Sequence, residues 1–530
     1  MDQNIFIGGA WPYANSSLHV GHIAALLPGD VIARYYRKNG DNVLYVSGSD
    51  SHGTPITLRA RKEHRNPIDI VNHYHSEFNE CFKELQFTYD KYTFTCSEYH
   101  KSFVRDCIKK IYDNGYIYEK EELQDYCEHC NQFLTDREVE GTCPICGGHA
   151  TGEQCDNCMA TFNTNELNNK HCKYCGQPVS SRTSKHLYWK LSAFQKEIEE
   201  FVTSHEDIWR FNAINESKKY LIEGLKDRVI TRELEWGIDI PINGFEDKKV
   251  YVWIEAVLGY ISAGKLYCEE NGLDWNTFYK NPSVKSYYVH GKDNIPFHTI
   301  IYPALLLSLD ENFHLPDYII SSEYLNVNDE KISKRKGNGA TVKELLEMYD
   351  ADTIRYYMIY QAPEKRDSNF NCEHVTLVHN KKLVGEYGNF VNRNLAFLVK
   401  KFNGITPAGI VDQDVKNVIL KTYDIVGSSI RTGELKYALT KIQELVQFAN
   451  KYYDEHKPWI TVNENVTDFN NTTATCLELI INMANLYEPF MPYSSHKIFS
   501  FFQQADNSWK YIEVKPFTKL NCVSIIFSRI

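Results

Sequence analysis

The chain places eight of its 15 cysteines in four Cys-x-x-Cys pairs between residues 127 and 175. The pairs are Cys127/Cys130, Cys143/Cys146, Cys155/Cys158 and Cys172/Cys175. Each has the spacing of a zinc knuckle, and two pairs together supply the four thiolates of one tetrahedral site. Pairs clustered in this way indicate metal ligation rather than disulfides. The sequence therefore predicts two structural zinc ions, neither with an open coordination position for chemistry.

Spacing alone allows three ways of combining the four pairs. The loop between Cys146 and Cys155 is short, and closing a short loop costs little entropy. We therefore expect the two inner pairs to share one ion and the two outer pairs to share the other, in a nested arrangement.

Composition and charge exclude several classes of protein. With 530 residues, 43% of them hydrophobic, the chain can bury a large core. Its longest apolar run, at 300–309, is interrupted by Pro303 and too short to cross a bilayer. The N-terminus lacks the features of a signal peptide, so we expect a cytoplasmic protein without a membrane partner. A net charge of -11 argues against general DNA binding but allows a local basic surface for one structured RNA.

The order of predicted elements indicates a parallel sheet. "NIFIGGA" at 4–10 is strand-like, 19–38 has helical apolar spacing, and 41–50 is a second strand. Further strand-like segments occur at 248–257, 286–293 and 317–325, and helical patterns dominate from about 375. We predict an α/β fold, a split Rossmann-like parallel sheet domain with a zinc-knuckle insertion, followed by an α-helical bundle domain. The expected divisions are 1–115 and 236–320 for the two halves of the catalytic domain, 116–235 for the insertion, 321–385 for a signature-loop and stem-contact region, and 386–530 for the helical domain.

Two short segments suggest a phosphate site, although no Gly-x-x-x-x-Gly-Lys-Ser/Thr loop occurs. In "LHVGHI", His19 and His22 would flank a helix N-terminus that attracts phosphate, and Gly21 would let a base approach the backbone. In "KISKRKG" at 331–337, flexible lysines would stabilise polyphosphate charge. The alternatives are capping or surface histidines and a solvated basic loop.

These segments resemble the two signature sequences of the class I aminoacyl-tRNA synthetases. Five segments are similar to the methionyl-tRNA synthetase family in particular: "WPYANSSLHVGH", "SGSDSHGTPI", "YVWIEA", "GKDNIPFH" and "KPW". The similarity spans nearly the whole chain. The resemblance implies ATP-dependent activation of L-methionine and its transfer to initiator and elongator tRNA(Met). It also implies Mg²⁺ with ATP and two zinc ions.

The resemblance implies roles for individual residues. His19 and His22 would contact the ATP phosphates beside Gly21, and Lys331, Ser333 and Lys334 would close over them. The residues implied for methionine are Trp11, Tyr13, Asp50, Trp253, Ala256, Tyr260 and His298, with Asp50 taking the ammonium group. From periodicity alone, Trp253 is a core residue. Trp11, Val257 and Arg335 depart from the common family pattern.

For the helical domain, the resemblance implies that Asn389, Arg393 and Trp459 read the CAU anticodon by stacking and edge hydrogen bonds. From the sequence alone, "PW" is a packing corner. A monomer is favoured. Two other readings stay open: a class I synthetase for leucine, isoleucine or valine, and a non-catalytic zinc-containing tRNA-binding protein.

Overall fold

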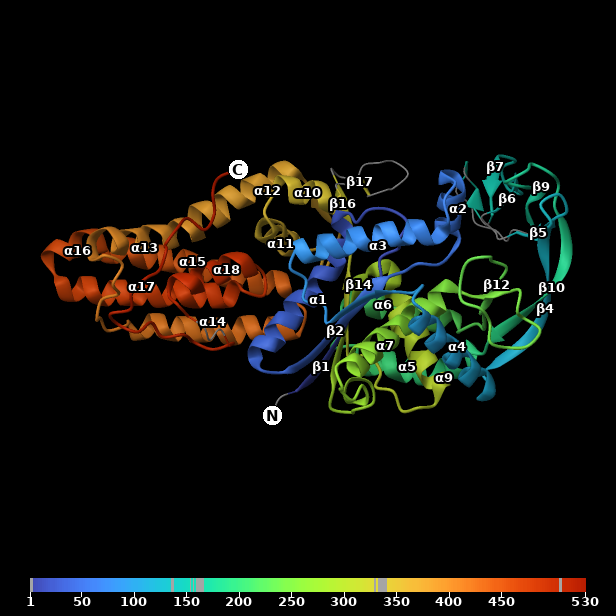
Figure 1. Ribbon diagram of the computed structural model, residues 1–530, viewed down its shortest axis with the longest axis horizontal. Coiled ribbons are helices and arrows are strands. Elements are labelled where there is room, and N and C mark those ends of the chain that lie inside the picture. Colours follow the sequence, from blue (N-terminus) through green and yellow to red (C-terminus); the bar gives the residue numbers. More distant parts are fainter. Residues whose placement is uncertain are drawn as a thin grey trace.

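The computed structural model describes residues 3–134, 138–152, 154, 155, 157, 158, 166–327, 330, 331, 341–504 and 508–530. The molecule is elongated, with a sheet in the middle, the cysteine-rich insertion at one end and a helical bundle at the other (Figure 1). Ser333, Lys334 and Arg335 of the predicted basic segment lie outside the described residues, and Lys331 is described by its backbone only.

Five parallel strands form the central sheet in the order β15-β14-β1-β2-β3. Their bounds are β1 Asn4–Gly9, β2 Asn42–Ser49, β3 Lys91–Phe94, β14 Lys285–Gly291 and β15 Tyr318–Ser322. Alternate residues enter two cores, Ile7 and Tyr45 on one face and Phe6 and Leu44 on the other. Both faces are therefore buried, as in α/β proteins generally. The predicted α/β fold with a split parallel sheet is confirmed.

Two helices cover the opposite faces of this sheet. α1 (Val20–Asn39) packs against β14 and β2, and α7 (Val252–Glu270) packs against β2 and β3. Within α1, Pro28 has no N–H for the carbonyl of Ala24. The hydroxyl of Ser322 donates to that carbonyl at 3.3 Å, which ties the end of β15 to α1.

The predicted strand at 248–257 is wrong. Only Lys249–Val250 (β13) is extended there, and α7 begins at Val252. Residues on several sides of the first turns of α7 are buried, including Ile254 and Leu258, so the sequence shows a continuous apolar run instead of a one-sided pattern. Such a run fits a buried strand and a buried helix equally well.

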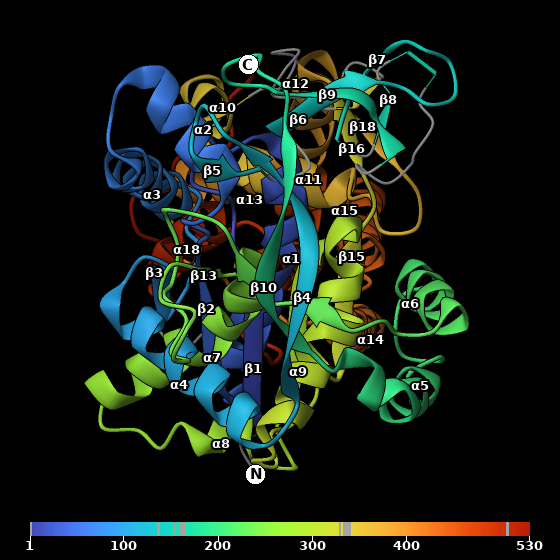
Figure 2. The same cartoon turned by 90° about the vertical axis from the view of Figure 1, so that its right-hand side faces the viewer.

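The insertion leaves the sheet domain along a long antiparallel ribbon, β4 (Ile117–Cys127) paired with β10 (Ser180–Trp189), which faces the viewer in Figure 2. A small sheet in the order β8-β7-β6-β9 lies at its far end and carries cysteine pairs. Its strands are β6 Val139–Thr142, β7 His149–Thr151, β8 Gln154–Cys155 and β9 Asn168–Cys172. The other elements on this side of the molecule are α2 Thr54–Glu63, α3 Pro67–Glu84, α4 Glu98–Asp113, β5 Gln132–Phe133, α5 Gln195–Ser204, α6 Phe211–Glu223, β11 Arg228–Val229, β12 Thr231–Arg232, α8 Asn276–Tyr279 and α9 Tyr302–Leu309.

Helices dominate the rest of the chain, as predicted. A three-stranded sheet of β16 (Leu325–Val327), β17 (Glu330–Lys331) and β18 (Ser368–Phe370) lies at the junction. The helices are α10 Val342–Met348, α11 Ala351–Tyr360, α12 Cys372–Val378, α13 Asn389–Phe402, α14 Gln413–Arg431, α15 Leu435–His456, α16 Pro458–Glu464, α17 Val466–Tyr487 and α18 Pro492–Phe501. One hydrophobic core runs from the α1 face of the sheet into this bundle, so the two parts share their packing.

Candidate functional site

A cavity of about 420 Å3 lies at the carboxyl ends of the sheet strands. Its walls come from segments that follow β1, β2, β14 and β15, and from the first turns of α1 and α7. In open parallel sheets, ligands bind at this edge beside the point where the strand order reverses. The sequence-predicted residues that line it are Trp11, Tyr13, His19, Gly21, His22, Asp50, Trp253, Ala256, Tyr260 and His298.

His19 and His22 cap the helix whose start they form. The sequence predicts His19 in the first helical turn, but His19 is the N-cap of α1, which begins at Val20. Its Nδ1 accepts a hydrogen bond from the Gly21 N–H at 3.2 Å. The His19 N–H in turn donates to His22 Nδ1 at 3.0 Å, and the two rings lie 3.8 Å apart. Because both Nδ1 atoms accept, each neutral ring carries its proton on Nε2. The capping alternative is therefore correct as local structure, and the same residues line the cavity.

The two ends of the basic segment flank the cavity, although residues 332–340 lie outside the described part of the chain. Before the segment, Leu325 of β16 lines the cavity. After it, Thr341 forms a backbone bridge with His19, and the Val342 N–H donates to the Leu18 carbonyl at 2.9 Å. The described residues before and after the segment thus lie at one wall of the cavity and beside the start of α1, respectively.

Asp50 lies just beyond β2 and is buried. Its backbone N–H donates to Pro12 and its carbonyl accepts from Ala14, both at 2.8 Å. Burial raises the pKa of Asp50 well above its ordinary value, and a negative charge on Glu255 would add to this effect. No cation among the described residues offsets this burial. A cationic ligand group would balance the carboxylate.

Tyr260 and His298 form a neutral, hydrogen-bonded wall. The Tyr260 hydroxyl lies 2.7 Å from His298 Nε2, and His298 Nδ1 lies 2.8 Å from the Asn294 carbonyl. A carbonyl only accepts, so Nδ1 carries the proton and the tyrosine hydroxyl donates to Nε2. Burial lowers the pKa of His298 to about 4, which leaves the ring neutral at pH 7. Trp253 is 39% exposed and lies 4.2 Å from Phe297, so it is a wall residue rather than a core residue.

Two glycines make room for the indole ring of Trp11. An added Cβ at Gly48 would lie 2.3 Å from Trp11 Cζ3, and one at Gly259 would lie 2.6 Å from Cζ2. The ring is therefore held between β2 and α7. Its size helps to set the dimensions of the cavity that it lines.

Sequence reasoning missed a charged cluster on the β14 side of the cavity. Lys292 bonds Glu323 at 2.6 Å and Asp367 at 3.1 Å, and its ammonium lies 3.9 Å from the centre of the Tyr324 ring. The Tyr324 hydroxyl donates to Asp293. A signal was present, because "GKDN" at 291–294 lies at the end of the predicted strand 286–293 and belongs to the segments that carry the family resemblance.

The cysteines gather in two groups of four, combined in the nested way predicted. Within each group the sulfur atoms lie within 4.8 Å of one another. Contacts between sulfur atoms include Cys127–Cys175 at 3.5 Å, Cys130–Cys172 at 3.9 Å, Cys146–Cys155 at 3.5 Å and Cys143–Cys158 at 3.9 Å. Zinc–sulfur bonds of about 2.3 Å in a tetrahedron give sulfur–sulfur edges of about 3.8 Å, which matches these contacts.

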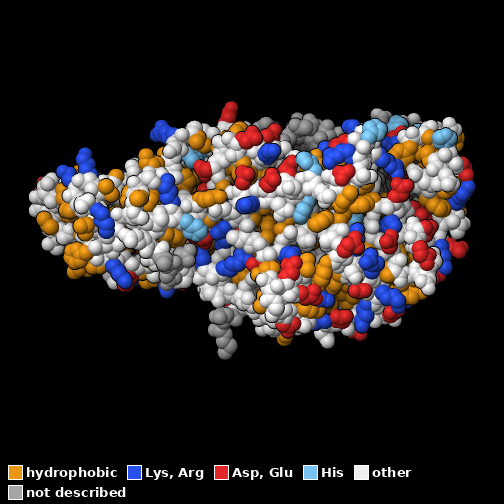
Figure 3. All heavy atoms as spheres, viewed as in Figure 1, with side chains coloured by type: hydrophobic (Ala, Val, Ile, Leu, Met, Phe, Trp, Pro, Cys, Tyr) orange, Lys and Arg blue, Asp and Glu red, His pale blue; other side chains and the backbone are white. Residues whose placement is uncertain are grey.

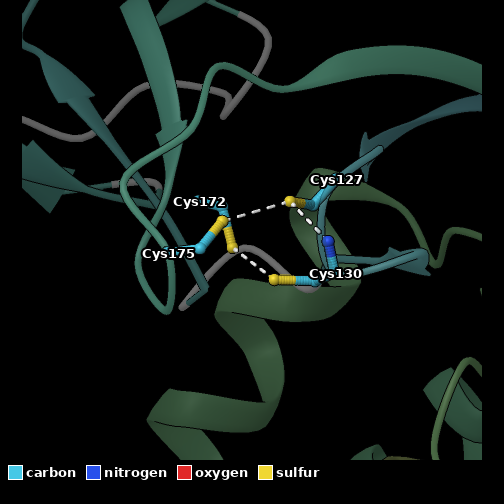
Figure 4. Close-up of side chains that lie close together, drawn as sticks. All are labelled: Cys127, Cys130, Cys172 and Cys175. Atoms are coloured by element: carbon cyan, nitrogen blue, oxygen red, sulfur yellow. Dashed lines mark hydrogen bonds between the residues drawn. The ribbon is translucent and has the colours of Figure 1, made fainter.

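The first group brings together residues from β4, β9 and the turns after them (Figure 4). In the second group, the Gly148 N–H donates to Cys146 Sγ, and this hydrogen bond together with those from neighbouring cysteine thiols lowers the pKa of the Cys146 thiol to about 6. Thiolates are the form that binds metal. Both groups therefore fit structural zinc in their sulfur–sulfur distances and in having four thiols, the ligand set that structural zinc takes.

The predicted anticodon residues lie at the bundle. Asn389 and Arg393 are one turn apart on α13. The Arg393 guanidinium lies 4.0 Å from the centre of the Tyr453 ring and 2.9 Å from Asp454, and Trp459 of α16 lies 5.3 Å from the same Tyr453 ring. Trp459 is 43% exposed, so one part packs at a corner and another offers a stacking face.

Comparison with known proteins identifies the family of the chain. A profile described as "tRNA synthetases class I (M)" matches residues 5–395, and one described as "Anticodon binding domain of methionyl tRNA ligase" matches residues 412–523. The chain belongs to the class I (M) tRNA synthetases. The cavity of this synthetase falls within the first match, and helices α14 to α18 of the bundle fall within the second. Asn389 and Arg393 of α13 lie within the first match.

Full-length relatives of this synthetase are known. Methionine--tRNA ligase 1 of Alkaliphilus oremlandii is 47% identical over 528 residues, covering 100% of this chain and 97% of the relative. Methionine--tRNA ligase of Bacillus cereus is 47% identical over 530 residues with the same coverage. The Mycobacterium tuberculosis methionyl-tRNA synthetase bound by methionyl-adenylate has the same fold, with a TM-score of 0.83 at 22% identity over 99% of this chain and 100% of that chain.

Charged side chains of both signs are interspersed over the face of the synthetase in Figure 3. Within the described ranges, no helix is both long enough and apolar enough to traverse a bilayer.

Proposed function

We propose that this synthetase is a methionine-tRNA ligase, which activates L-methionine with ATP and transfers the methionyl group to the 3′ end of tRNA(Met). The observation that carries the proposal is that residues predicted from separate segments of the sequence line one cavity. The full-length relatives named methionine--tRNA ligase support the same substrate.

In the proposed complex, Asp50 receives the ammonium group of methionine. Trp253, Ala256, Tyr260 and His298, with Trp11 and Tyr13, enclose the side chain. Rings and neutral hydrogen-bonding groups suit a polarisable thioether, and the buried carboxylate suits the ammonium group.

His19, Gly21 and His22 bind ATP at the start of α1, and Lys331, Ser333 and Lys334 close over the phosphates. A methionine carboxylate oxygen attacks the α-phosphorus, an oxygen–phosphorus bond forms, and the bond to pyrophosphate breaks. Positioning and charge neutralisation then accelerate the step, and no protein nucleophile takes part. Lys334 is the residue that we assign to transition-state charge.

Two metals belong to the proposal. Mg²⁺ accompanies ATP and is held mainly by phosphate and water. Two structural zinc ions are held by the groups Cys127, Cys130, Cys172, Cys175 and Cys143, Cys146, Cys155, Cys158, which matches the chemistry of eight thiolates.

In residues 386–530, the proposed anticodon-binding domain, Asn389, Arg393 and Trp459 contact the anticodon of initiator and elongator tRNA(Met). The exposed part of Trp459 would stack on a base.

Amino-acid-dependent ATP–pyrophosphate exchange tests the proposal. Exchange with methionine, and not with leucine, isoleucine or valine, is expected. Exchange with a branched amino acid instead would identify a different synthetase, and no exchange with any would indicate a non-catalytic tRNA-binding protein. Lys334→Ala should slow exchange by at least about 100-fold with little change in methionine binding.

A further inference from the structure

Glu255 is a fully buried carboxyl group that the proposed reaction does not use. It lies in the first turn of α7, between the cavity residues Trp253 and Ala256, and its exposed fraction is 0%. A buried carboxyl group costs free energy unless it is hydrogen-bonded. Its Oε1 atom lies 2.7 Å from His52 Nδ1, which is also buried.

His52 connects this contact to Asp50. The His52 backbone N–H donates to Asp50 Oδ1 at 3.4 Å, and its carbonyl accepts from the Tyr13 hydroxyl. On the far side of the ring, His52 Nε2 lies 3.5 Å from Cys96 Sγ. The His52 imidazole is thus held from both sides. The His52 backbone N–H holds the Asp50 carboxylate, which is proposed to bind the ammonium group.

The hydrogen atoms in this series of hydrogen bonds, from Glu255 through His52 to Cys96, can be assigned. Cys96 Sγ lies 3.9 Å from the Ser51 carbonyl oxygen and 3.5 Å from His52 Nε2, an arrangement in which the thiol donates to the carbonyl and accepts from Nε2–H. Nδ1 is then the acceptor, and Glu255 donates to it as a protonated acid. In agreement, burial raises the pKa of Glu255 well above its ordinary value and lowers that of His52 to about 3.

We propose that Glu255 and His52 form a neutral strut that fixes the distance between the α7 wall of the methionine pocket and the carboxylate of Asp50. Glu255 is then a positioning residue that acts through His52. The proposal rests on the proposed function, because it takes methionine as the substrate. A neutral strut adds no negative charge beside Asp50, which itself must be ionised to bind an ammonium group.

The test separates ammonium binding from side-chain binding. The KM for methionine is measured by ATP–pyrophosphate exchange, and 4-(methylthio)butanoate, which lacks the amino group, serves as a competitive inhibitor. Glu255→Ala should raise the KM for methionine at least about tenfold, with less than a twofold change in the Ki of the analogue and in the KM for ATP. Glu255→Gln, whose amide can donate to His52 Nδ1, should stay within about threefold of the wild type.

Ser262→Ala is the matched control. Ser262 is also buried on α7, but its hydroxyl bonds His100 Nδ1 at 2.8 Å and not the loop that carries Asp50. It should leave the ratio of methionine KM to analogue Ki unchanged.

If Glu255→Ala raises the KM for methionine and the Ki of the analogue equally, or changes neither, the proposed strut is refuted. So would a Glu255→Gln variant as defective as Glu255→Ala. If the wild-type chain shows no exchange with methionine, the proposed function fails instead, and the two failures are distinguished.

Discussion

Ionisable side chains around the proposed methionine pocket are kept neutral by burial. The pKa of His298 falls to about 4, so its ring cannot charge near pH 7 and keeps accepting from Tyr260. His52 and Glu255 form a second neutral pair behind the loop that carries Asp50. The carboxylate of Asp50 thus faces a pocket in which His298 stays neutral between about pH 6 and 8, with a neutral His52 behind it.

The glycines that accommodate Trp11 give a prediction for single residues. Gly48→Ala and Gly259→Ala should each displace the indole ring, because the new Cβ would lie 2.3 Å and 2.6 Å from it. Overpacking of this kind costs about 1–3 kcal/mol of folding stability, and at Gly48 the new Cβ would also lie 2.6 Å from the Thr93 carbonyl oxygen. Because the displaced indole ring changes the shape of the pocket, the KM for methionine should rise by roughly tenfold in both variants, with a smaller effect on the KM for ATP. Pyrophosphate exchange kinetics measure this, and an unchanged methionine KM in both variants would show that Trp11 does not shape the pocket.

At the scale of elements, the strands and helices with regular patterns were predictable. β1 and β2 are short apolar runs bounded by polar and small residues, and α1 has helical spacing. α7 was mistaken for a strand because its first turns are buried on several sides. The partners of Lys292 could not be foreseen, since Glu323 and Asp367 come from distant segments that only the folded chain brings together.

The cysteine groups predict which double substitutions cost one zinc ion and which affect two. The wild-type chain should carry two ions. Cys130→Ala with Cys172→Ala removes two ligands from one group and should leave one ion bound, as measured by metal analysis of purified protein. The matched variant Cys130→Ala with Cys146→Ala should weaken both sites. Loss of both ions in the first variant would contradict the nested arrangement.

The contact between α11 and α18 predicts a pH dependence of stability. Asp352 accepts from the Ser494 N–H at 2.6 Å, and burial raises its pKa from 3.8 to about 6. The folded chain therefore holds this proton more tightly than the unfolded chain. The stabilisation is complete below pH 3.8 and is lost as the pH rises through about 6, by up to about 3 kcal/mol.

Asp352→Asn does not titrate, so it should lack this decrease. Thermal unfolding midpoints at pH 4.5 and pH 7.5 provide the measurement. The unfolding midpoint of the wild type, relative to that of the variant, should be lower at pH 7.5 than at pH 4.5. Parallel pH profiles would show that Asp352 does not make this contribution.

At the scale of the whole molecule, a buried cluster of charges joins the catalytic sheet to the bundle. Arg355 of α11 bonds Asp30 of α1 at 2.7 Å, and Arg34 of α1 bonds Glu488, just beyond α17, at 2.9 Å. Removing one partner of such a buried ion pair strongly destabilises the folded protein, because the other charge is left buried and unpaired. The helix whose start carries His19 and His22 is therefore anchored to the bundle that carries Trp459.

This arrangement fits one tRNA that reaches from the cavity at the central sheet to the bundle at one end of the elongated molecule in Figure 1. The most direct test is methionylation of tRNA(Met) transcripts with the CAU anticodon or a changed anticodon, by the wild-type chain and by Trp459→Ala. We expect methionylation of the CAU transcript only, and a loss in Trp459→Ala of at least about tenfold that leaves methionine-dependent pyrophosphate exchange within about twofold of the wild type. Failure to methionylate the CAU transcript under conditions that support exchange, or equal methionylation of both transcripts, would contradict the account.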